Sequence, residues 1–202
     1  MGRGVFYGSA MTEAMECSGE HVVLVGGANS AGQAAAFVSR FAAKVTIAIR
    51  GPSLDASMSR YLINQLAAIP NVEVRTCTRL VTCKGDDHLE CVELVDDSTG
   101  EREQVPTNHV FVFIGAAPLT DWLPGQIRRD ESGFVLTGPD LVSDGGNPSE
   151  WPLDRQPYLL ESSVPGVFVA GDVRSQSVKR VASAVGEGAM AVQFVHEYLK
   201  EM

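Results

Sequence analysis

The chain has 202 residues, a formal net charge of −9 at pH 7 and a sequence pI of about 4.9. That length suits one large domain or two small ones. Lysine and arginine do not cluster, which argues against a nucleic-acid partner and against an anionic membrane surface. No apolar run approaches the length of a membrane span, and the N-terminal residues lack the pattern of a signal peptide. We therefore expect a protein that stays in the cytoplasm.

The cysteines do not form a recognisable metal or redox pattern. Cys17, Cys77, Cys83 and Cys91 include no C-x-x-C pair. Cys83, His88 and Cys91 lie close enough in sequence to be considered as metal ligands, but their spacing fits no standard zinc site. We expect no metal, and we expect these residues to be reduced thiols and ordinary strand or turn positions.

The pattern between residues 21 and 75 predicts a βαβαβ unit. Short apolar strands are expected at 21–26, 44–50 and 71–75, and helices are expected at 27–42 and 53–69. This order is the unit of a doubly wound dinucleotide-binding fold.

The two expected helices differ in composition. The first is rich in small residues that allow close packing on a sheet, and Asn29 or Ser30 would supply its N-terminal cap. The second has an apolar face with a nearly helical period. That face consists of Leu54, Met58, Tyr61, Leu62 and Leu66.

Beyond residue 77 the pattern changes to strand-like runs separated by polar turns. Residues 77–114 predict an antiparallel meander that ends in a buried strand at 110–114. The remaining expected elements are a turn and short helix at 115–123, a long loop at 138–157, a strand at 166–172 and a helix at about 179–200.

A glycine-rich turn, "GGANSAG", joins the first strand to the first helix. It places backbone N–H groups at a helix N-terminus, which attracts a pyrophosphate. Ala28 replaces the second glycine of the G-x-G-x-x-G/A fingerprint, and a tight turn in any α/β protein is the alternative interpretation. In its βαβ context the turn predicts a dinucleotide site. The residues expected to bind are Gly26, Gly27, Ala28, Asn29, Ser30 and Ala31.

Arg50 stands at the end of the second strand, where an NAD site usually has an acidic residue for the ribose 2′-hydroxyl. A guanidinium there suits a 2′-phosphate, and an exposed arginine at a strand end is the alternative. We expect the site to prefer NADPH to NADH.

Four segments resemble, in the same order, low-molecular-weight thioredoxin reductases. They are "GRGVFY" at 2–7, "VVLVGGANSAGQAA" at 22–35, "VFVFIGAAPLTDWL" at 110–123 and "LESSVPGVFVAGDVRSQSVKRVASAVGEGAMAV" at 160–192. The resemblance implies a homodimeric flavoenzyme that uses NADPH and FAD, with an FAD domain interrupted by an inserted NADPH domain. It implies an α/β fold with a Rossmann-like NADPH-binding domain and its antiparallel meander at 1–114. Residues 115–202 would be the C-terminal part of the FAD-binding domain.

The resemblance also places flavin contacts in the second half of the chain. Asp172, after Gly171, would accept a hydrogen bond from the flavin ribityl chain. The backbone N–H groups of Arg180, Val181 and Ala182 would lie beside the flavin pyrimidine ring, where a helix N-terminus stabilises a reduced flavin.

Gly115 opens the segment that returns to the FAD domain, and it is included among the cofactor-binding positions.

The sequence departs from the family at the redox centre. Gly8 and Met11 stand where the family has its two redox cysteines, and Cys17 nearby cannot form an internal disulfide alone. Gly51 stands at the second of the family's paired NADPH arginines, beside Arg50. Thioredoxin-reductase-like bacterial proteins and ferredoxin–NADP reductases of the same architecture also lack these cysteines.

The family's first FAD segment, with its own glycine-rich loop, would precede Gly2. We therefore expect the chain to be a fragment, a truncated gene product or half of a split protein. The leading interpretation is a flavin-linked NADPH-dependent oxidoreductase, with hydride passing from NADPH to FAD and on to an unknown acceptor. The alternative is a non-catalytic dinucleotide-binding or regulatory module. No catalytic acid or base is evident among the four scattered histidines.

Overall fold

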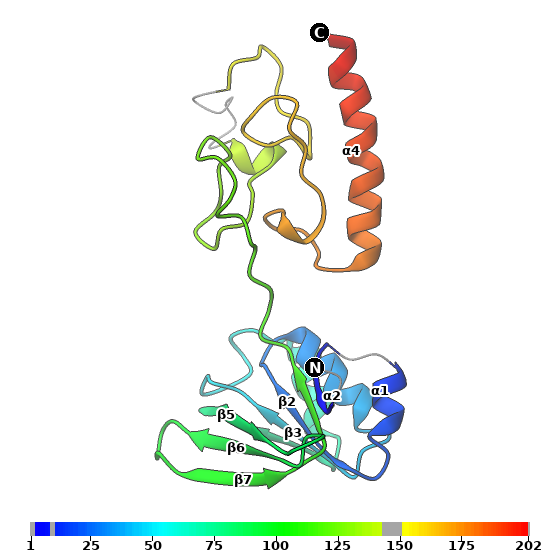
Figure 1. Ribbon diagram of the computed structural model, residues 1–202, viewed down its shortest axis with the longest axis vertical. Coiled ribbons are helices and arrows are strands. Elements are labelled where there is room, and N and C mark those ends of the chain that lie inside the picture. Colours follow the sequence, from blue (N-terminus) through cyan, green and yellow to red (C-terminus); the bar gives the residue numbers. More distant parts are fainter. Residues whose placement is uncertain (1–2, 9–10, 143–150, 202) are drawn as a thin grey trace. The chain divides into compact units, whose positions relative to one another are not determined.

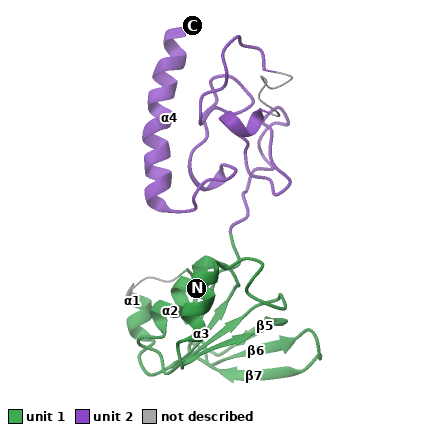
Figure 2. Ribbon diagram, turned by 180° about the vertical axis from the view of Figure 1, so that it is seen from behind, with its two compact units in different colours: residues 1–115 green, residues 116–202 purple. Residues whose placement is uncertain are grey.

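The computed structural model describes residues 3–8, 11–142 and 151–201. The chain divides into two compact units, residues 1–115 (unit 1) and residues 116–202 (unit 2), coloured separately in Figure 2. The regular strands that the structure describes belong to unit 1.

Unit 1 is built on a five-stranded parallel sheet in the order β1-β8-β2-β3-β4. Figure 1 labels its central strands β2 and β3. Its strands are β1 (Val5–Tyr7), β2 (His21–Val25), β3 (Lys44–Ala48), β4 (Val72–Arg75) and β8 (His109–Val112). The central strands β2 and β3 are continuous runs of buried residues, as expected for parallel strands covered on both faces. The predicted βαβαβ unit is confirmed.

Helices cover one face of this sheet. They are α1 (Met11–Glu16), α2 (Asn29–Val38) and α3 (Arg60–Ala67). Leu24, Ile47 and Phe111 of the sheet pack in one buried cluster with Cys17, which follows α1, and with Leu66 of α3. Burial of these side chains is the main force that holds the helices in place.

An antiparallel sheet covers the opposite face. It consists of β5 (Thr78–Lys84), β6 (Cys91–Asp96) and β7 (Arg102–Pro106). Val92, Leu94 and Val105 of this sheet pack against Val23 and Val110 of the parallel sheet. The predicted meander is therefore confirmed, and it takes the place that a second layer of helices has in other doubly wound folds.

The second predicted helix of unit 1 is too long at its N-terminal end. The structure begins α3 at Arg60 and not near residue 53, because Ser57 and Ser59 form hydrogen bonds outside a helix. Leu54 and Met58 are nevertheless buried in the core, as their apolar character requires. The prediction for Tyr61 is wrong, because its side chain is 74% exposed.

Unit 2 contains one long helix, α4 (Val181–Glu201), and two short 3-10 helices, η1 (Gly138–Leu141) and η2 (Gly171–Val173). The strand predicted at 166–172 is wrong, because the described residues of unit 2 supply no neighbouring strand to pair with it. Phe168 forms only an isolated bridge with Glu161.

The short helix predicted at 115–123 is also wrong. These residues are irregular up to a turn at Asp121 and Trp122. The described residues of the predicted long loop include η1 and the buried side chains of Leu141 and Trp151. Residues 143–150 of that loop lie outside the described residues.

A buried carboxylate ties the irregular part of unit 2 to α4. Glu161 is fully buried and accepts two hydrogen bonds from the Arg155 guanidinium, at 2.7 and 3.0 Å, and one each from the Tyr158 and Gly166 backbone N–H groups. Arg155 also pairs with Glu201 of α4 at 2.7 Å. These two carboxylates raise the pKa of the Arg155 guanidinium well above its usual value.

Candidate dinucleotide site

The glycine-rich turn leaves β2 at the edge where the parallel strands end. The Gly26 N–H donates to the Ala48 carbonyl of β3 at 3.1 Å. Gly26 has φ +137°, and a Cβ there would clash with the carbonyl oxygen of Phe113, which follows β8. A Cβ on Gly27 would lie 3.2 Å from the Ile49 side chain. Glycine at these two positions therefore lets the turn pass closely between the ends of β8 and β3.

The start of α2 presents unpaired backbone donors. The first intrahelical bond runs from the Gly32 N–H to the Ala28 carbonyl at 3.2 Å. In the described part of the chain, nothing accepts a hydrogen bond from the backbone N–H groups of residues 27–31. These donors and the positive end of the helix dipole fit a bound pyrophosphate.

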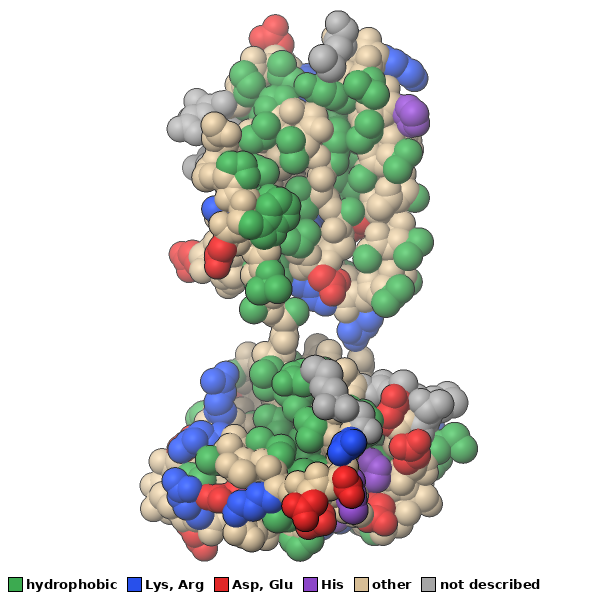
Figure 3. All heavy atoms as spheres, in the orientation of Figure 1, with side chains coloured by type: hydrophobic (Ala, Val, Ile, Leu, Met, Phe, Trp, Pro, Cys, Tyr) green, Lys and Arg blue, Asp and Glu red, His purple; other side chains and the backbone are tan. Residues whose placement is uncertain are grey.

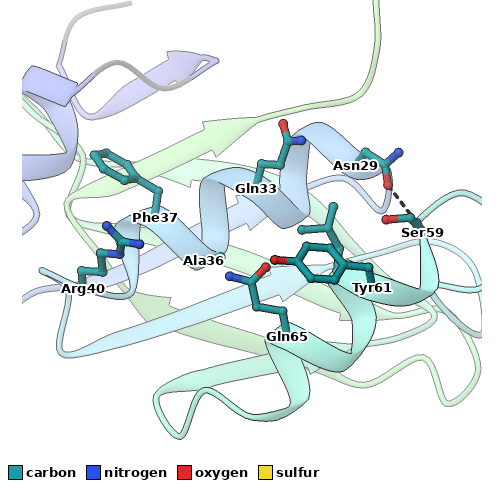
Figure 4. A pocket seen from close by; sticks show the side chains of 9 residues that line it. Asn29, Gln33, Ala36, Phe37, Arg40, Ser59, Tyr61 and Gln65 are labelled. Atoms are coloured by element: carbon teal, nitrogen blue, oxygen red, sulfur yellow. Dashed lines mark hydrogen bonds between the residues drawn. The ribbon is translucent and has the colours of Figure 1, made fainter.

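The predicted helix cap is wrong, and the difference favours an anion site. The N-cap residue is Ala28, whose side chain makes no capping bond. The Asn29 Oδ1 atom instead accepts a hydrogen bond from the Ser59 N–H at 2.8 Å, as Figure 4 shows. The first turn of α2 therefore keeps its donors for a ligand.

Arg50 lies at the same edge of the sheet as the glycine-rich turn, two residues beyond the end of β3. Its side chain is exposed. Across the described residues, no hydrogen bond or ion pair engages its guanidinium. An unpaired guanidinium beside a row of backbone donors suits a second phosphate group.

Two serines at this site were not predicted from the sequence. The Ser57 Oγ–H donates to the Gly27 carbonyl at 2.8 Å, and Ser59 holds Asn29 as described above. The partners are 30 residues apart, so no local pattern indicates these contacts.

A cavity of about 310 Å³ lies between α2 and α3 (Figure 4). Its lining is mostly polar and includes Gln33, Arg40, Tyr61 and Gln65. Of the predicted binding residues, Asn29 also lines this cavity. The cavity therefore lies beside the candidate site and is not formed by it.

Unit 2 presents Asp172 on a short turn that α4 holds in place. Gly171 has φ +80°, and a Cβ there would lie 3.2 Å from Ala184 of α4. Glu187 of α4 accepts a hydrogen bond from the Gly171 N–H at 2.7 Å and pairs with Arg174 at 2.6 Å. The Arg174 guanidinium holds the pKa of Glu187 below its usual value. The Asp172 side chain is exposed and has no hydrogen-bond partner among the described residues.

The first residues of α4 are not equivalent as donors. The Arg180 N–H donates to the Val178 carbonyl at 2.7 Å, so it is already satisfied. The N–H groups of Val181 and Ala182 have no acceptor within the described parts of the chain. Gly115 is exposed, with φ +87° and open space around its Cα.

Gly8 and Met11, where the resemblance led us to expect two redox cysteines, carry no thiol. Gly8 follows β1, donates to the Val112 carbonyl at 3.3 Å and has φ +88°, a conformation that strains residues with a Cβ. Met11 begins α1, and its side chain lies outside the described residues.

Cys17 is not a reactive substitute for the dithiol. It is fully buried, and its thiol donates to the Glu13 carbonyl at 3.1 Å. Burial, together with the charges of Glu16 and Glu20, raises the pKa of this thiol to about 11. A thiol with this pKa is a poor nucleophile at neutral pH. All four cysteines are free, and no group of three metal-ligating side chains occurs in the described segments.

The fold and the glycine-rich turn define an α/β protein of the dinucleotide-binding class. The sequence profile of the family described as pyridine nucleotide-disulphide oxidoreductase matches residues 7–188. The chain therefore belongs to the pyridine nucleotide-disulphide oxidoreductase family, as the resemblance predicted.

Thioredoxin reductases are among the relatives and solved structures that this chain resembles. The chain is 32% identical over 206 residues to thioredoxin reductase from Bacillus subtilis, covering 100% of this chain and 57% of that protein. The crystal structure of thioredoxin reductase from T. acidophilum matches with a TM-score of 0.72 and 27% identity, covering 100% of this chain and 59% of the other. The crystal structure of thioredoxin reductase from Lactococcus lactis matches with a TM-score of 0.74 and 23% identity. The match covers 99% of this chain and 59% of the other chain, and it shows that the two share a fold.

The thioredoxin reductase family uses FAD and NADPH. This chain spans less than three fifths of the length of these relatives. No helix in the described ranges is both long and apolar enough to cross a membrane.

Proposed function

We propose that this chain is the pyridine-nucleotide half of a flavin-linked, NADPH-dependent oxidoreductase that resembles thioredoxin reductase but lacks its dithiol. Residues 1–114 form the NADPH-binding domain, and residues 115–202 form the C-terminal part of the FAD-binding domain. When both cofactors are bound, NADPH supplies a hydride and the flavin accepts it and passes electrons to an acceptor.

The observation that carries the proposal is the row of unpaired N–H groups at residues 27–31 beside the unpaired guanidinium of Arg50. The N–H groups suit the pyrophosphate, and Arg50 suits the 2′-phosphate that distinguishes NADPH from NADH. Gly26 and Gly27 keep the turn close to the sheet edge, so that the dinucleotide can lie across the ends of β2 and β3.

The residues of unit 2 contribute the flavin side. Asp172 accepts a hydrogen bond from the ribityl chain, because its carboxylate is exposed and unpaired within the described residues. The N–H groups of Val181 and Ala182 at the start of α4 would favour negative charge on the pyrimidine part of a bound flavin. Arg180 contributes through its position at the helix start, because its own N–H donates to Val178.

The electron acceptor is not reached through a local dithiol. Gly8 and Met11 occupy the positions of the two cysteines, and Cys17 is a buried thiol with a raised pKa. A bound flavin would therefore have to reduce an acceptor other than a dithiol at these positions.

Substitution of Arg50 tests the proposal. A charge-assisted contact to phosphate contributes on the order of 1.5–3 kcal/mol. Arg50→Ala is therefore expected to weaken NADPH binding about tenfold or more and to leave NADH binding nearly unchanged. Isothermal titration of the 202-residue chain with each nucleotide measures both affinities.

Arg40→Ala is the matched control, because Arg40 is an exposed arginine that lines the cavity between α2 and α3. It is expected to change neither affinity. Equal losses for NADPH and NADH in Arg50→Ala would contradict the role assigned to Arg50.

A second candidate function is a non-catalytic dinucleotide-binding or regulatory module. The observation in its favour is that unit 2 has no second glycine-rich phosphate loop among its described residues. Absorbance in the flavin band distinguishes the two functions. The chain is mixed with excess FAD and with the family's first FAD segment, and unbound FAD is then removed; a module that has lost the flavin is colourless after this step.

A further inference from the structure

We propose that the loop between β3 and α3 acts as a clamp that positions the phosphate-binding turn, with Ser57 as its main positioning residue. The clamp is defined as residues 53–59. The proposal deepens the function proposed above and rests on it, because the clamp is argued to act through the NADPH-binding turn. The geometry consists of three contacts between the clamp and the turn.

Two of these contacts are hydrogen bonds. The Ser57 hydroxyl donates to the Gly27 carbonyl at 2.8 Å, and the Ser59 N–H donates to the Asn29 Oδ1 atom at 2.8 Å. Both bonds cross from the clamp to the turn over a separation of 30 residues.

The third contact is apolar. Met58 is buried between the two serines, and a Cβ on Gly32 would lie 2.8 Å from its terminal methyl carbon. Met58 therefore packs directly on the first turn of α2 at Gly32. The clamp thus holds the turn at Gly27, Asn29 and Gly32.

The Ser57 bond fixes the direction of a donor that the phosphate needs. The Gly27 carbonyl and the Ala28 N–H belong to one planar peptide group, so they point in opposite directions. Holding the carbonyl toward Ser57 therefore turns the Ala28 N–H away from the clamp. This N–H has no acceptor within the described residues. Accepting a hydrogen bond at the carbonyl also makes the N–H of the same peptide group a stronger donor.

The Asn29 bond keeps the helix start open. Asparagine at the beginning of a helix often caps it with its own side chain. Here the Ser59 N–H occupies the Asn29 Oδ1 atom, and no side chain caps α2. The donors at residues 29–31 stay available for an anion.

The clamp and Arg50 have separable effects on nucleotide choice. Arg50 distinguishes the 2′-phosphate, whereas the clamp acts on the turn that binds the pyrophosphate common to both nucleotides. Ser57→Ala is therefore expected to weaken NADPH and NADH binding equally, by about threefold to tenfold. The ratio of the two affinities is expected to stay at the wild-type value.

The experiment is isothermal titration of the full 202-residue chain with NADPH and with NADH. Ser57→Thr keeps the hydroxyl and is expected to restore most of the affinity. Ser53→Ala is the matched control, because the Ser53 hydroxyl accepts a bond only within the clamp, from the Asp55 N–H at 3.3 Å. It is expected to bind both nucleotides like the wild type.

Hydrogen exchange distinguishes a local effect on the clamp from a loss of overall stability. NADPH is expected to slow exchange at residues 27–31 and also at residues 53–59 in the wild type, because the clamp and the turn move together. In Ser57→Ala the protection at 53–59 is expected to fall while the core strand β2 stays protected. If Ser57→Ala fails to fold, the Asn29→Ala variant is used in its place in both measurements. Asn29→Ala removes the other hydrogen bond between the clamp and the turn.

Each outcome decides the proposal. Wild-type affinity and wild-type protection in Ser57→Ala, with NADPH bound by the wild-type chain, would overturn the clamp alone. A loss confined to NADPH would also overturn it, because the clamp does not contact the 2′-phosphate. If the wild-type chain binds neither nucleotide, the proposed function falls and the clamp falls with it.

Discussion

The interactions that stabilise unit 1 internally differ from those that stabilise unit 2. Unit 1 has two clusters of buried apolar side chains, one on each face of its parallel sheet. Unit 2 has no regular strand among its described residues, and its long helix α4 contains no buried residue. Unit 2 does bury some apolar side chains, among them Val135, Leu141 and Leu160. Charged side chains add to this packing, through the Glu161–Arg155–Glu201 cluster and the Glu187–Arg174 pair.

One side of α4 exposes a row of apolar side chains. Val181, Val185, Val192, Val195 and Leu199 follow one another at steps of three, four or seven residues, so they lie on one side of the helix. Val181 is 82% exposed and Val192 is 59% exposed. Figure 3 shows hydrophobic side chains along the outer edge of α4. The apolar side chains of unit 1 are therefore largely buried in its own core. Unit 2 instead exposes an apolar face of α4, which contact with another protein surface would bury.

The largest expected effect is loss of the buried carboxylate in unit 2. Glu161→Ala leaves Arg155 without its main partner and removes the acceptor for two backbone N–H groups. Breaking a buried ion pair in this way costs about 3–5 kcal/mol, so unit 2 is expected to unfold first and separately from unit 1. Thermal unfolding followed by Trp122 and Trp151 fluorescence reports on unit 2, because both tryptophans lie in it.

Glu131→Gln is the control, because Glu131 is exposed on a turn of the same unit. A single unfolding transition that is unchanged in Glu161→Ala would contradict the view that charge pairs hold unit 2 together.

The next effect concerns self-association through α4. A fully buried valine contributes on the order of 1.5 kcal/mol or more, so contact between apolar faces is favourable. The wild-type chain is expected to associate, and Val192→Lys is expected to weaken that association about tenfold. Sedimentation velocity over a concentration series measures it.

Gln193→Lys adds the same charge at the neighbouring exposed position, away from the apolar side of the helix. It is expected to associate like the wild type. Equal behaviour of the two variants would show that the α4 face is not the contact surface.

The smallest expected effect is at Cys17, which belongs to the finished core of unit 1. With a pKa of about 11, only about a thousandth of this thiol is ionised at pH 8, and ionisation increases as the pH rises toward 11. Cys83 is exposed and is expected to react with a thiol reagent first, with Cys17 reacting slowly. Cys17→Ser is expected to leave the affinity for NADPH unchanged. Loss of a measurable disulfide reductase activity in that variant would identify Cys17 as a redox centre.

The sequence predicted unit 1 better than unit 2, and the reason is the range of the contacts. The strand and turn at residues 21–31 follow from local apolar runs and from glycines that the close sheet edge requires. The apolar run at 166–172 looks similar in isolation, but a strand exists only where a neighbour pairs with it. The burial of Glu161 also has no local signal, because it depends on Arg155 and on the backbone of Gly166.

The candidate site shows the same limit. The glycine-rich turn and Arg50 could be proposed as a site from spacing alone, because both follow strand ends of a βαβ unit. The Ser57 and Asn29 contacts required the tertiary structure, since each joins residues about 30 positions apart. The length of α3 was misjudged for the same reason.

The central claim is that the one glycine-rich turn described in this chain serves NADPH and that unit 2 alone does not retain FAD. The missing pyrophosphate contacts would each contribute on the order of 1.5–3 kcal/mol, out of a total of about 12 kcal/mol for a nanomolar cofactor. The most direct test is an equilibrium titration of the purified 202-residue chain with NADPH, with and without excess FAD. We predict one NADPH per chain, an affinity that FAD does not change, and purified protein that is essentially free of flavin. Displacement of NADPH by FAD, or yellow protein with near-stoichiometric FAD, would contradict the account.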